Sequence, residues 1–597
     1  LAQAILAQAT WLPKRLPPRH PLRGLWGGTM ATMISRYDEG RRYDPLEETY
    51  RALEDAVGST RARGCRELGR MGENGAATFG THETLLTYLE DFDVEVQAAA
   101  VVALGQMGRF GADCASSIAK KLGSPSKEVR RAAARALAAL GEQVAGYASA
   151  VEDRLDDKEP SVVVDACVAL GAMRSTSSAQ KLVAKLQDKN PEIVASACTG
   201  LGYMNAETDA VAKMMQHQDP RVRAAAVGSF APSLQAAENN AAKIAALVGD
   251  EDAYVRIAAV NVLSALGEKA APQAQALGQL CGSKDAGVRA AAAAALGGIG
   301  EMAASQVDRL EALLSDAGED KSTLPLTVAG VQSKVAPALR KPACAAAASL
   351  SVMGEAAKRA ADKLAQGLGS PDVEIRVQCA HALGKLGAAA AMHEESLADM
   401  LGDSQPMAVA AACHALGGLA EAVKTVNPST AEKVAACLKD KHPAVRGAAC
   451  AGLGRMGEEA KPFIESIVKC LDDNTGYVRS QAVAAIPACG EVGQMFANQV
   501  CRMMFDPEMR VRLAAVTTMP KLGQRGVAHA EEVAALLDDP VPSVRMAAVK
   551  CLGSLSAKEL SGYEGALAQL GEHDDAADVR EAAQQAVSGM KAIEAGE

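Results

Sequence analysis

The chain has 597 residues, of which 49% are hydrophobic but only 3% are aromatic. A core with so few large rings is built from small side chains at close helix–helix contacts, which disfavours β-sandwiches and most compact enzyme cores. The 62 Lys and Arg against 72 Asp and Glu give a net charge of −10, so phosphate backbones and anionic lipids would repel the chain. No nucleic-acid ligand is therefore expected, and no run of about 18 apolar residues predicts a membrane span.

The N-terminal segment, residues 1–37, differs from the rest of the chain because it is basic and has no acidic residue before Asp38. Its cationic residues are Lys14, Arg15, Arg19, Arg23 and Arg36. Three interpretations remain open. The segment is a translated leader before a start at Met30 or Met33, an organelle transit peptide, or an ordered arm.

From residue 38 to residue 597 the sequence repeats with a period of 33 residues, set by glycines that close successive copies. These glycines include Gly108 and Gly141, Gly267 and Gly300, Gly354 and Gly387, and Gly457, Gly490 and Gly523. Leu or Ile stands four residues before the glycine, and a Val-Arg or Ile-Arg pair stands twelve and eleven residues before it. About sixteen copies fit between residues 46 and 592.

Each copy is predicted to form two helices. The second follows an Asp that often precedes Pro, as at Asp219, Asp506 and Asp539, where the carboxylate can cap free N–H groups and proline suits the first turn. It continues through V-R-x-A-A-x-A-L-G, and the glycine ends it. Two short helices cannot bury a face alone, so successive pairs must stack. The fold class is therefore all-α, an α-solenoid.

The pattern D-x-x-x-x-V-R-x-A-A-x-A-L-G resembles the HEAT repeat, in particular the short variety of phycobilisome lyase subunits. The resemblance implies that the recurring Asp and Arg form a ladder of charge-assisted hydrogen bonds between neighbouring copies. The arginines at that position are Arg130, Arg223, Arg256, Arg289, Arg376, Arg446, Arg479, Arg512, Arg545 and Arg580. Such repeats serve many unrelated proteins, so the resemblance specifies the fold and not the function.

Two kinds of departure from the repeat are candidates for function. An insertion rich in Gly, Ser, Thr and Pro occupies residues 316–341 and is predicted to be a surface loop, either tolerated or partner-binding. Valine replaces the ladder arginine at Val163, Val194 and Val409, which indicates either a partner contact or a drier stack, and the drier stack is favoured.

The sequence assigns no catalytic, cofactor or metal residue. The 14 cysteines include no C-x-x-C pair. Six alternate with alanine from copy to copy in the same helical context, as reduced core thiols do, namely Cys65, Cys167, Cys198, Cys413, Cys450 and, one place earlier in its copy, Cys379. The HEAT-type deoxyhypusine hydroxylases carry His-Glu pairs at matched positions, but here His82-Glu83 and His393-Glu394 do not share a repeat position.

These features predict a non-catalytic scaffold that holds a protein partner along its concave surface, with no small-molecule substrate. Variable residues on the second helices are the expected contacts, namely Arg66, Arg135, His381, His414 and Lys550. The alternative is a phycobilin-lyase-like factor that handles a chromophore, and an iron hydroxylase is a weaker one. Reduced cysteines predict the cytoplasm, or an organelle if residues 1–37 are a transit peptide.

Overall fold

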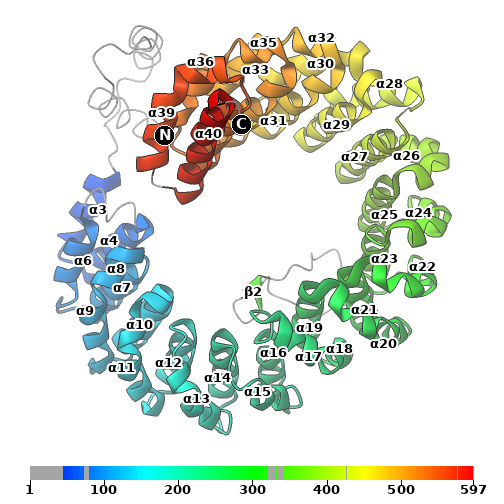
Figure 1. Ribbon diagram of the computed structural model, residues 1–597. Coiled ribbons are helices and arrows are strands. Elements are labelled where there is room, and N and C mark those ends of the chain that lie inside the picture. Colours follow the sequence, from blue (N-terminus) through cyan, green and yellow to red (C-terminus); the bar gives the residue numbers. More distant parts are fainter. Residues whose placement is uncertain are drawn as a thin grey trace. The chain divides into compact units, whose positions relative to one another are not determined.

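A computed structural model describes residues 45–72, 80–319, 327–328, 331–332, 340–424, 426–574 and 576–595. Residues 1–37, with their three interpretations, lie outside the described part. The described residues form sixteen helix pairs that stack on their neighbours within each of two units, which confirms the all-α solenoid (Figure 1). The chain divides into two compact units, Leu1–Ala236 and Ala237–Glu597.

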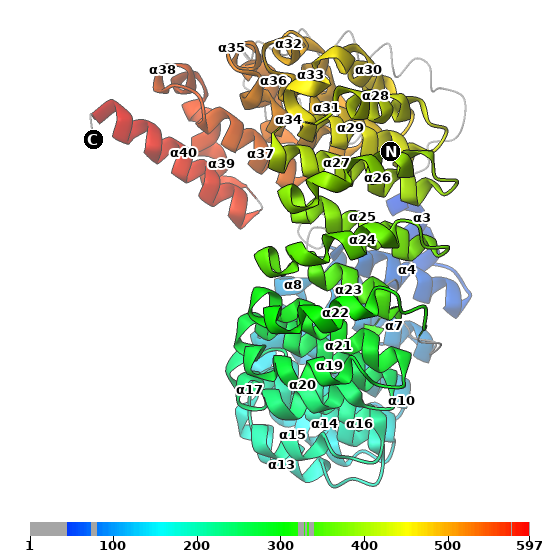
Figure 2. The ribbon, with the colours of Figure 1, turned by 90° about the vertical axis from the view of Figure 1, so that its right-hand side faces the viewer.

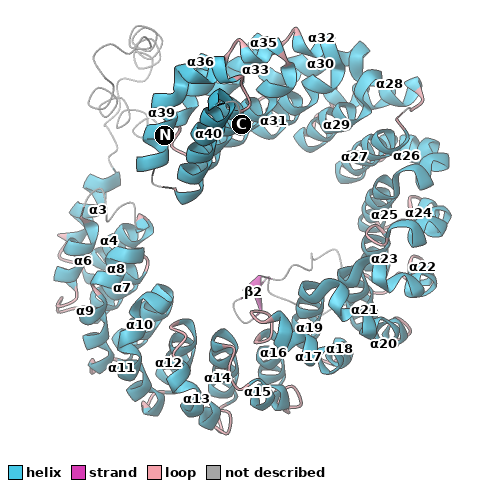
Figure 3. Cartoon of the chain, in the orientation of Figure 1, coloured by secondary structure: helices cyan, strands magenta, loops and turns pink. Residues whose placement is uncertain are grey.

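The first unit holds six helix pairs. Its first helices are α3 (Pro45–Leu53), α6 (Thr81–Tyr88), α9 (Ala115–Lys120), α11 (Ala148–Glu152), α13 (Ala179–Lys185) and α15 (Thr208–Met214). Its second helices are α4 (Gly58–Arg70), α7 (Val94–Gly105), α10 (Lys127–Leu140), α12 (Pro160–Ala172), α14 (Pro191–Met204) and α16 (Pro220–Gly228). Within this unit the second helices line the inner side of the curved stack (Figures 1 and 3).

The second unit holds ten helix pairs arranged in the same way. Its first helices are α18 (Ala241–Ala246), α20 (Ala274–Leu280), α22 (Val307–Leu313), α24 (Ala361–Gly367), α26 (Glu394–Asp399), α28 (Pro428–Ala436), α30 (Ile464–Lys469), α33 (Ala497–Arg502), α36 (Ala530–Ala535) and α39 (Glu564–His573). Its second helices are α19 (Ala253–Leu266), α21 (Ala286–Ile299), α23 (Pro342–Leu350), α25 (Val373–Leu386), α27 (Pro406–Val423), α29 (Pro443–Met456), α31 (Gly476–Ala485), α34 (Met509–Thr518), α37 (Pro542–Gly553) and α40 (Ala577–Ala595). Figure 2 shows the second helices α19, α21 and α23 following one another along the stack, and each packs against the next.

Short connecting elements complete the copies. One helix, α17 (Leu234–Asn239), lies where the two units meet in the sequence, and four others are α8 (Gly108–Asp113), α32 (Gly490–Gln494), α35 (Gln524–Val527) and α38 (Ala557–Leu560). In many copies a 3-10 turn follows the repeat glycine instead, for example Gly457–Phe463 before α30. The first helices are therefore shorter and less regular than the second ones.

The repeat glycine supplies a backbone conformation that other residues avoid. Gly141 ends α10 with φ 61° and ψ −136°, a region open only to glycine at low cost. The other repeat glycines also have positive φ. The turn redirects the chain from a second helix into the next first helix. Each copy needs one such turn, and this explains why the glycine recurs once in each 33-residue period.

The aspartates before the second helices have two different roles. Asp219 caps α16 by accepting a hydrogen bond from the N–H of Arg221 at 2.9 Å, as predicted. Asp506 and Asp539 do not cap their helices, which corrects that prediction, because α34 and α37 have no side-chain cap. These two carboxylates accept hydrogen bonds from the N–H groups of Glu508 and Val541, just before the helices, and from arginines of the preceding copies.

Small residues allow the second helices to approach closely. A Cβ added at Gly171 of α12 would lie 2.5 Å from Cα of Gly200 in α14, and one added at Gly417 of α27 would lie 2.8 Å from Cα of Gly452 in α29. The low aromatic content is therefore explained by the packing, because backbones this close leave no room for large rings between these helices.

One described helix, α27, is long and apolar enough to cross a membrane by length and composition alone. Of its most apolar window, 61% is buried inside the fold, where α27 packs between α25 and α29. Its apolar character is therefore explained by this packing, as in the core helix of a stack.

The insertion begins and ends in ordered contacts. Asp316 accepts two hydrogen bonds from Arg289, at 2.6 and 3.0 Å, and so belongs to the ladder as well as to the insertion. Within it, β1 (Thr327–Val328) and β2 (Val331–Gln332) pair antiparallel. Residues 320–326, 329–330 and 333–339 lie outside the described part.

Candidate functional site

A ladder of buried or partly buried arginine–aspartate pairs joins many of the described copies to the copies that follow them. In one rung, Nε and Nη2 of Arg130 donate to the two carboxylate oxygens of Asp157 at 2.7 and 2.8 Å. Nη1 of Arg130 donates to the carbonyls of Ser124 and Pro125 in its own copy, at 2.9 and 3.0 Å. One guanidinium thus fixes its own loop and the following copy, using the planar fork that suits a carboxylate.

The same two-pronged pairing recurs along both units. The rungs are Arg61–Asp91, Arg130–Asp157, Arg289–Asp316, Arg376–Asp403, Arg446–Asp473, Arg479–Asp506, Arg512–Asp539 and Arg545–Asp574. The remaining predicted ladder arginines hold carbonyls of their own loops through Nη1, namely Arg223, Arg256 and Arg580. The sequence analysis missed Arg61, because Thr60 replaces the usual Val before it.

The ladder keeps its carboxylates ionised. Hydrogen bonds from Arg61 outweigh burial and hold the pKa of Asp91 below its usual value. Burial alone would raise the pKa of Asp157, but hydrogen bonds from Arg130 and a backbone N–H bring that pKa below its usual value. A lowered carboxyl pKa in the folded state means that ionisation of these groups stabilises the stack.

Where valine replaces the ladder arginine, the side chain is buried. Val163, Val194 and Val409 are only 3%, 1% and 6% exposed, so a partner cannot reach them. This burial supports the interpretation that valine marks places where the contact between copies excludes water, and not places where a partner binds.

Lys341 supplies a rung that the sequence did not reveal. Its ammonium group contacts Asp372 and lies 2.9 Å from Glu374 of the next copy. Ala343 occupies the arginine position of this copy. The insertion therefore ends in a lysine that takes the place of the ladder arginine from two positions earlier in the copy. A search for arginine at the fixed repeat position could not have found this lysine.

One position per copy faces solvent on the second helices, six residues before the repeat glycine. We call it the exposed column. It comprises Arg66, Val102, Arg135, Val168, Thr199 and Gly228 in the first unit, and Asn261, Ala294, Ala348, His381, His414, Ala451, Ala484, Thr517, Lys550 and Gln585 in the second. Each of these residues is exposed or half-buried, whereas the leucine two places later, such as Leu137 or Leu383, is fully buried.

The predicted contact residues Arg66, Arg135 and Lys550 are exposed members of this column. Arg66 lies 3.4 Å from Glu95 of the next helix, and Arg135 donates to Asp165 at 2.9 Å. Two of these cations are therefore partly neutralised within the stack, and the surface they form is mixed in charge.

His381 and His414 lie on the adjacent helices α25 and α27. Burial lowers the pKa of His381, and the nearby Lys385 lowers it further. Burial also lowers the pKa of His414, with His381 and Arg455 adding to the effect. Both imidazoles are therefore neutral near pH 7 and present hydrogen-bonding groups rather than charge to a partner.

Comparison with known proteins assigns the family. The family model described as HEAT repeats matches residues 82–171, 115–202, 240–324, 394–487 and 498–588, which together are more than half of the chain. The chain belongs to the HEAT-repeat family. No curated protein matches the sequence of this HEAT-repeat chain.

Solved structures give the same fold. This HEAT-repeat chain is similar to yeast importin-beta (Kap95p), with 14% identity, a TM-score of 0.52, and coverage of 91% of this chain and 77% of the other. It is also similar to importin beta crystallised in an ammonium sulfate condition, with 14% identity, a TM-score of 0.50, and coverage of 92% and 77%. At this level of identity the likeness concerns the fold alone.

The His-Glu pairs of this HEAT-repeat chain make local contacts. The ring of His82 packs against Phe110 with centroids 5.0 Å apart. Nε2 of His393 lies 3.0 Å from Asp362, and Glu394 accepts a hydrogen bond from the N–H of Asn427 at 3.0 Å. His82 therefore packs against a neighbouring ring, whereas His393 and Glu394 make polar contacts with neighbouring copies.

The cysteines are free thiols, and 13 of the 14 are buried, including the six predicted core thiols. Burial raises the pKa of Cys167 and Cys198 to about 12. Cys437 is half-buried, and a hydrogen bond with the thiol of Cys413 holds the pKa of Cys437 below its ordinary value. Cys437 therefore combines access to solvent with a lowered thiol pKa, the two features that favour reaction of a thiol.

Proposed function

We propose that this HEAT-repeat chain is a non-catalytic scaffold that holds a protein partner along the exposed column of its second helices. The observation that carries the proposal is the contrast between this column and the rest of each copy. Ladder and glycine positions are occupied by contacts between copies, whereas the column faces solvent and changes from copy to copy. Many weak contacts to one extended partner suit such a surface.

The chemistry of the column indicates what kind of partner it suits. In the first unit the column carries two arginines beside valines, and Tyr203, four residues after Thr199, is 41% exposed. A protein segment with both apolar and acidic side chains matches this mixture. Nucleic acid is disfavoured as the partner, because the net charge of −10 repels its phosphate backbone.

A pair of matched photo-cross-linking variants tests the proposal. A photoreactive residue replaces Lys550 in the exposed column, and in the control it replaces Lys243, an exposed lysine on the first helix α18. Irradiation in extract of the cells that make the protein, followed by mass spectrometry, is expected to yield a partner from position 550 and not from position 243. A partner cross-linked equally from both positions, or only from 243, would contradict binding along the column.

Charge reversal gives a second readout of the same surface. Lys550→Glu is expected to weaken capture of that partner without unfolding the stack, and Lys243→Glu is expected to leave capture unchanged. Far-UV circular dichroism of both variants controls for folding. Equal capture by both variants would remove Lys550 from the contact surface.

The reducing compartment, such as the cytoplasm, is part of the proposal. Its support is the presence of fourteen free thiols without a disulfide. Alkylation before cell lysis is expected to modify thiols and to leave no disulfide-linked peptide in the mass spectrum. A reproducible disulfide in that experiment would place the protein elsewhere.

A further inference from the structure

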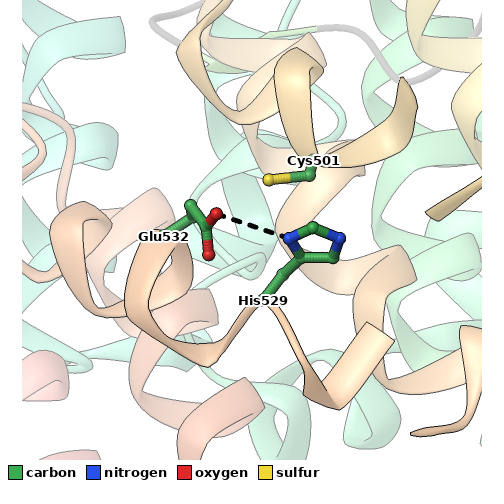
Figure 4. Close-up of side chains that lie close together, drawn as sticks. All are labelled: Cys501, His529 and Glu532. Atoms are coloured by element: carbon green, nitrogen blue, oxygen red, sulfur yellow. Dashed lines mark hydrogen bonds and ion pairs between the residues drawn. The ribbon is translucent and has the colours of Figure 1, made fainter. Parts of the chain in front are cut away.

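Three side chains with different donor atoms meet between two consecutive copies of the second unit. Cys501 comes from α33, His529 precedes α36, and Glu532 lies in the first turn of α36 (Figure 4). Their thiol, imidazole and carboxylate donor atoms all lie within 4.8 Å of one another. The thiol is buried, whereas the imidazole and the carboxylate reach solvent.

The separation of the imidazole and the carboxylate suits a metal better than a hydrogen bond. Nδ1 of His529 lies 3.4 Å from Oε1 of Glu532, which is longer than the 2.7–3.2 Å of a good N–H···O bond. Two ligands at about 2.0–2.1 Å from a tetrahedral zinc ion lie about 3.4 Å apart along the tetrahedron's edge. The observed distance therefore equals that edge, and the sulfur of Cys501 lies within 4.8 Å of both donor atoms.

A further hydrogen bond orients the histidine. Nε2 of His529 lies 2.8 Å from Oδ1 of Asn498, the second residue of α33. When Nε2–H donates to this amide oxygen, the lone pair is left on Nδ1, which points towards Glu532. Histidine ligands of metals are commonly held in this way, with the second ring nitrogen donating to a protein oxygen.

The carboxylate of Glu532 lies beside the thiol and the imidazole, so an anionic ligand is available to a cation bound there. A divalent ion bound among the three groups would displace the thiol proton, because a coordinated thiol is deprotonated. The half-exposed carboxylate leaves a side through which water can reach a fourth coordination position.

We propose that Cys501, His529 and Glu532 bind one divalent transition-metal ion of the zinc class. A sulfur ligand with imidazole and carboxylate is typical of zinc and its neighbours and unsuitable for calcium or magnesium. Three protein ligands leave one open position, so the site binds the ion with a water molecule. The ion ties α33 to α36 and thereby joins two neighbouring copies.

The repeat itself contains a matched control. His393 stands ten residues before the ladder residue Asp403, as His529 stands ten before Asp539, and its Nε2 also contacts the preceding first helix, at Asp362. The counterparts of Cys501 and Glu532 at the same distances from His393 are Ala365 and Ser396, neither of which offers a metal ligand of this kind. The donor set is therefore particular to the copies that contain Cys501 and His529.

Cobalt titration of the full-length chain, stripped of metal by a chelator, tests the proposal. We expect a thiolate-to-cobalt charge-transfer band and the strong visible bands of tetrahedral cobalt, saturating at one ion per chain, with zinc displacing the cobalt. Cys501→Ser is expected to abolish the charge-transfer band. His529→Ala and Glu532→Gln are expected to weaken binding by more than the roughly 10- to 100-fold expected for Asn498→Ala, which removes only the orienting partner.

His393→Ala and Cys437→Ser serve as controls and are expected to leave the titration unchanged. Circular dichroism of each metal-free variant shows whether the stack is intact, and zinc is expected to slow hydrogen exchange only in peptides from α33 and α36. The proposal is overturned if no thiolate band forms, if the band persists in Cys501→Ser, or if His393→Ala weakens binding as much as His529→Ala.

Discussion

The close contact between α12 and α14 gives a quantitative prediction. An alanine Cβ at Gly171 would lie 2.5 Å from Cα and 2.7 Å from the carbonyl oxygen of Gly200, whereas ordinary contacts begin at 3.4 Å. The two helices must therefore separate by about 0.9 Å, because backbone and not a flexible side chain is in the way. Overpacking of this kind costs about 1–3 kcal/mol, and the better helix propensity of alanine offsets up to about 1 kcal/mol.

We therefore expect Gly171→Ala to lower local stability by about 1–2 kcal/mol. Long repeat arrays do not unfold in one step, so the measurement is hydrogen exchange of the full chain by mass spectrometry. Peptides from α12 and α14 are expected to exchange about 5- to 30-fold faster.

Gly228→Ala is the control, because a Cβ there meets nothing within 4 Å at the end of α16. It is expected to leave local stability unchanged or to raise it by up to about 1 kcal/mol. Equal protection in both variants would refute the argument that glycine is required for close helix approach at residue 171.

Three further predictions concern the ladder and the thiols. Asp157→Asn leaves the guanidinium of Arg130, whose side chain is 6% exposed, without its charge partner, and is expected to cost about 3–5 kcal/mol in hydrogen-exchange protection of α10 and α12. Because the pKa values of Asp91 and Asp157 are lowered on folding, the contribution of these two carboxylates is complete above about pH 4 and is lost as the pH falls through their lower folded pKa values, which an acid titration by circular dichroism would detect. Iodoacetamide under native conditions is expected to modify one thiol first, Cys437, and Cys437→Ser is expected to remove that fast phase.

The repeat fold could be predicted from the sequence because its determinants are local and periodic. Helix-closing glycines and the Val-Arg pair recur at fixed spacing, and each imposes the same geometry in every copy. The exceptions follow from interactions between copies. Lys341 replaces a ladder arginine from two positions earlier, and Asp506 also serves the preceding copy. Neither role is visible in a single copy.

The metal-type cluster could not be predicted from sequence for a related reason. Cys501 and His529 are 28 positions apart, at different places in the repeat, so no short motif joins them. Only the stacking of α33 against the turn before α36 brings their donor atoms together. Spacing rules that identify metal sites within one loop or helix do not apply across a solenoid interface.

Different positions of each copy serve the fold and the binding surface, and this explains why the sequence predicts the fold and does not identify the partner. Positions that join copies are fixed by geometry: the ladder fork requires arginine and aspartate, and the closing turn requires positive φ. The exposed column has no such requirement, and it runs from arginine to alanine to histidine. Its variation is therefore where binding specificity can reside, and substitutions there should alter recognition while leaving the stack intact.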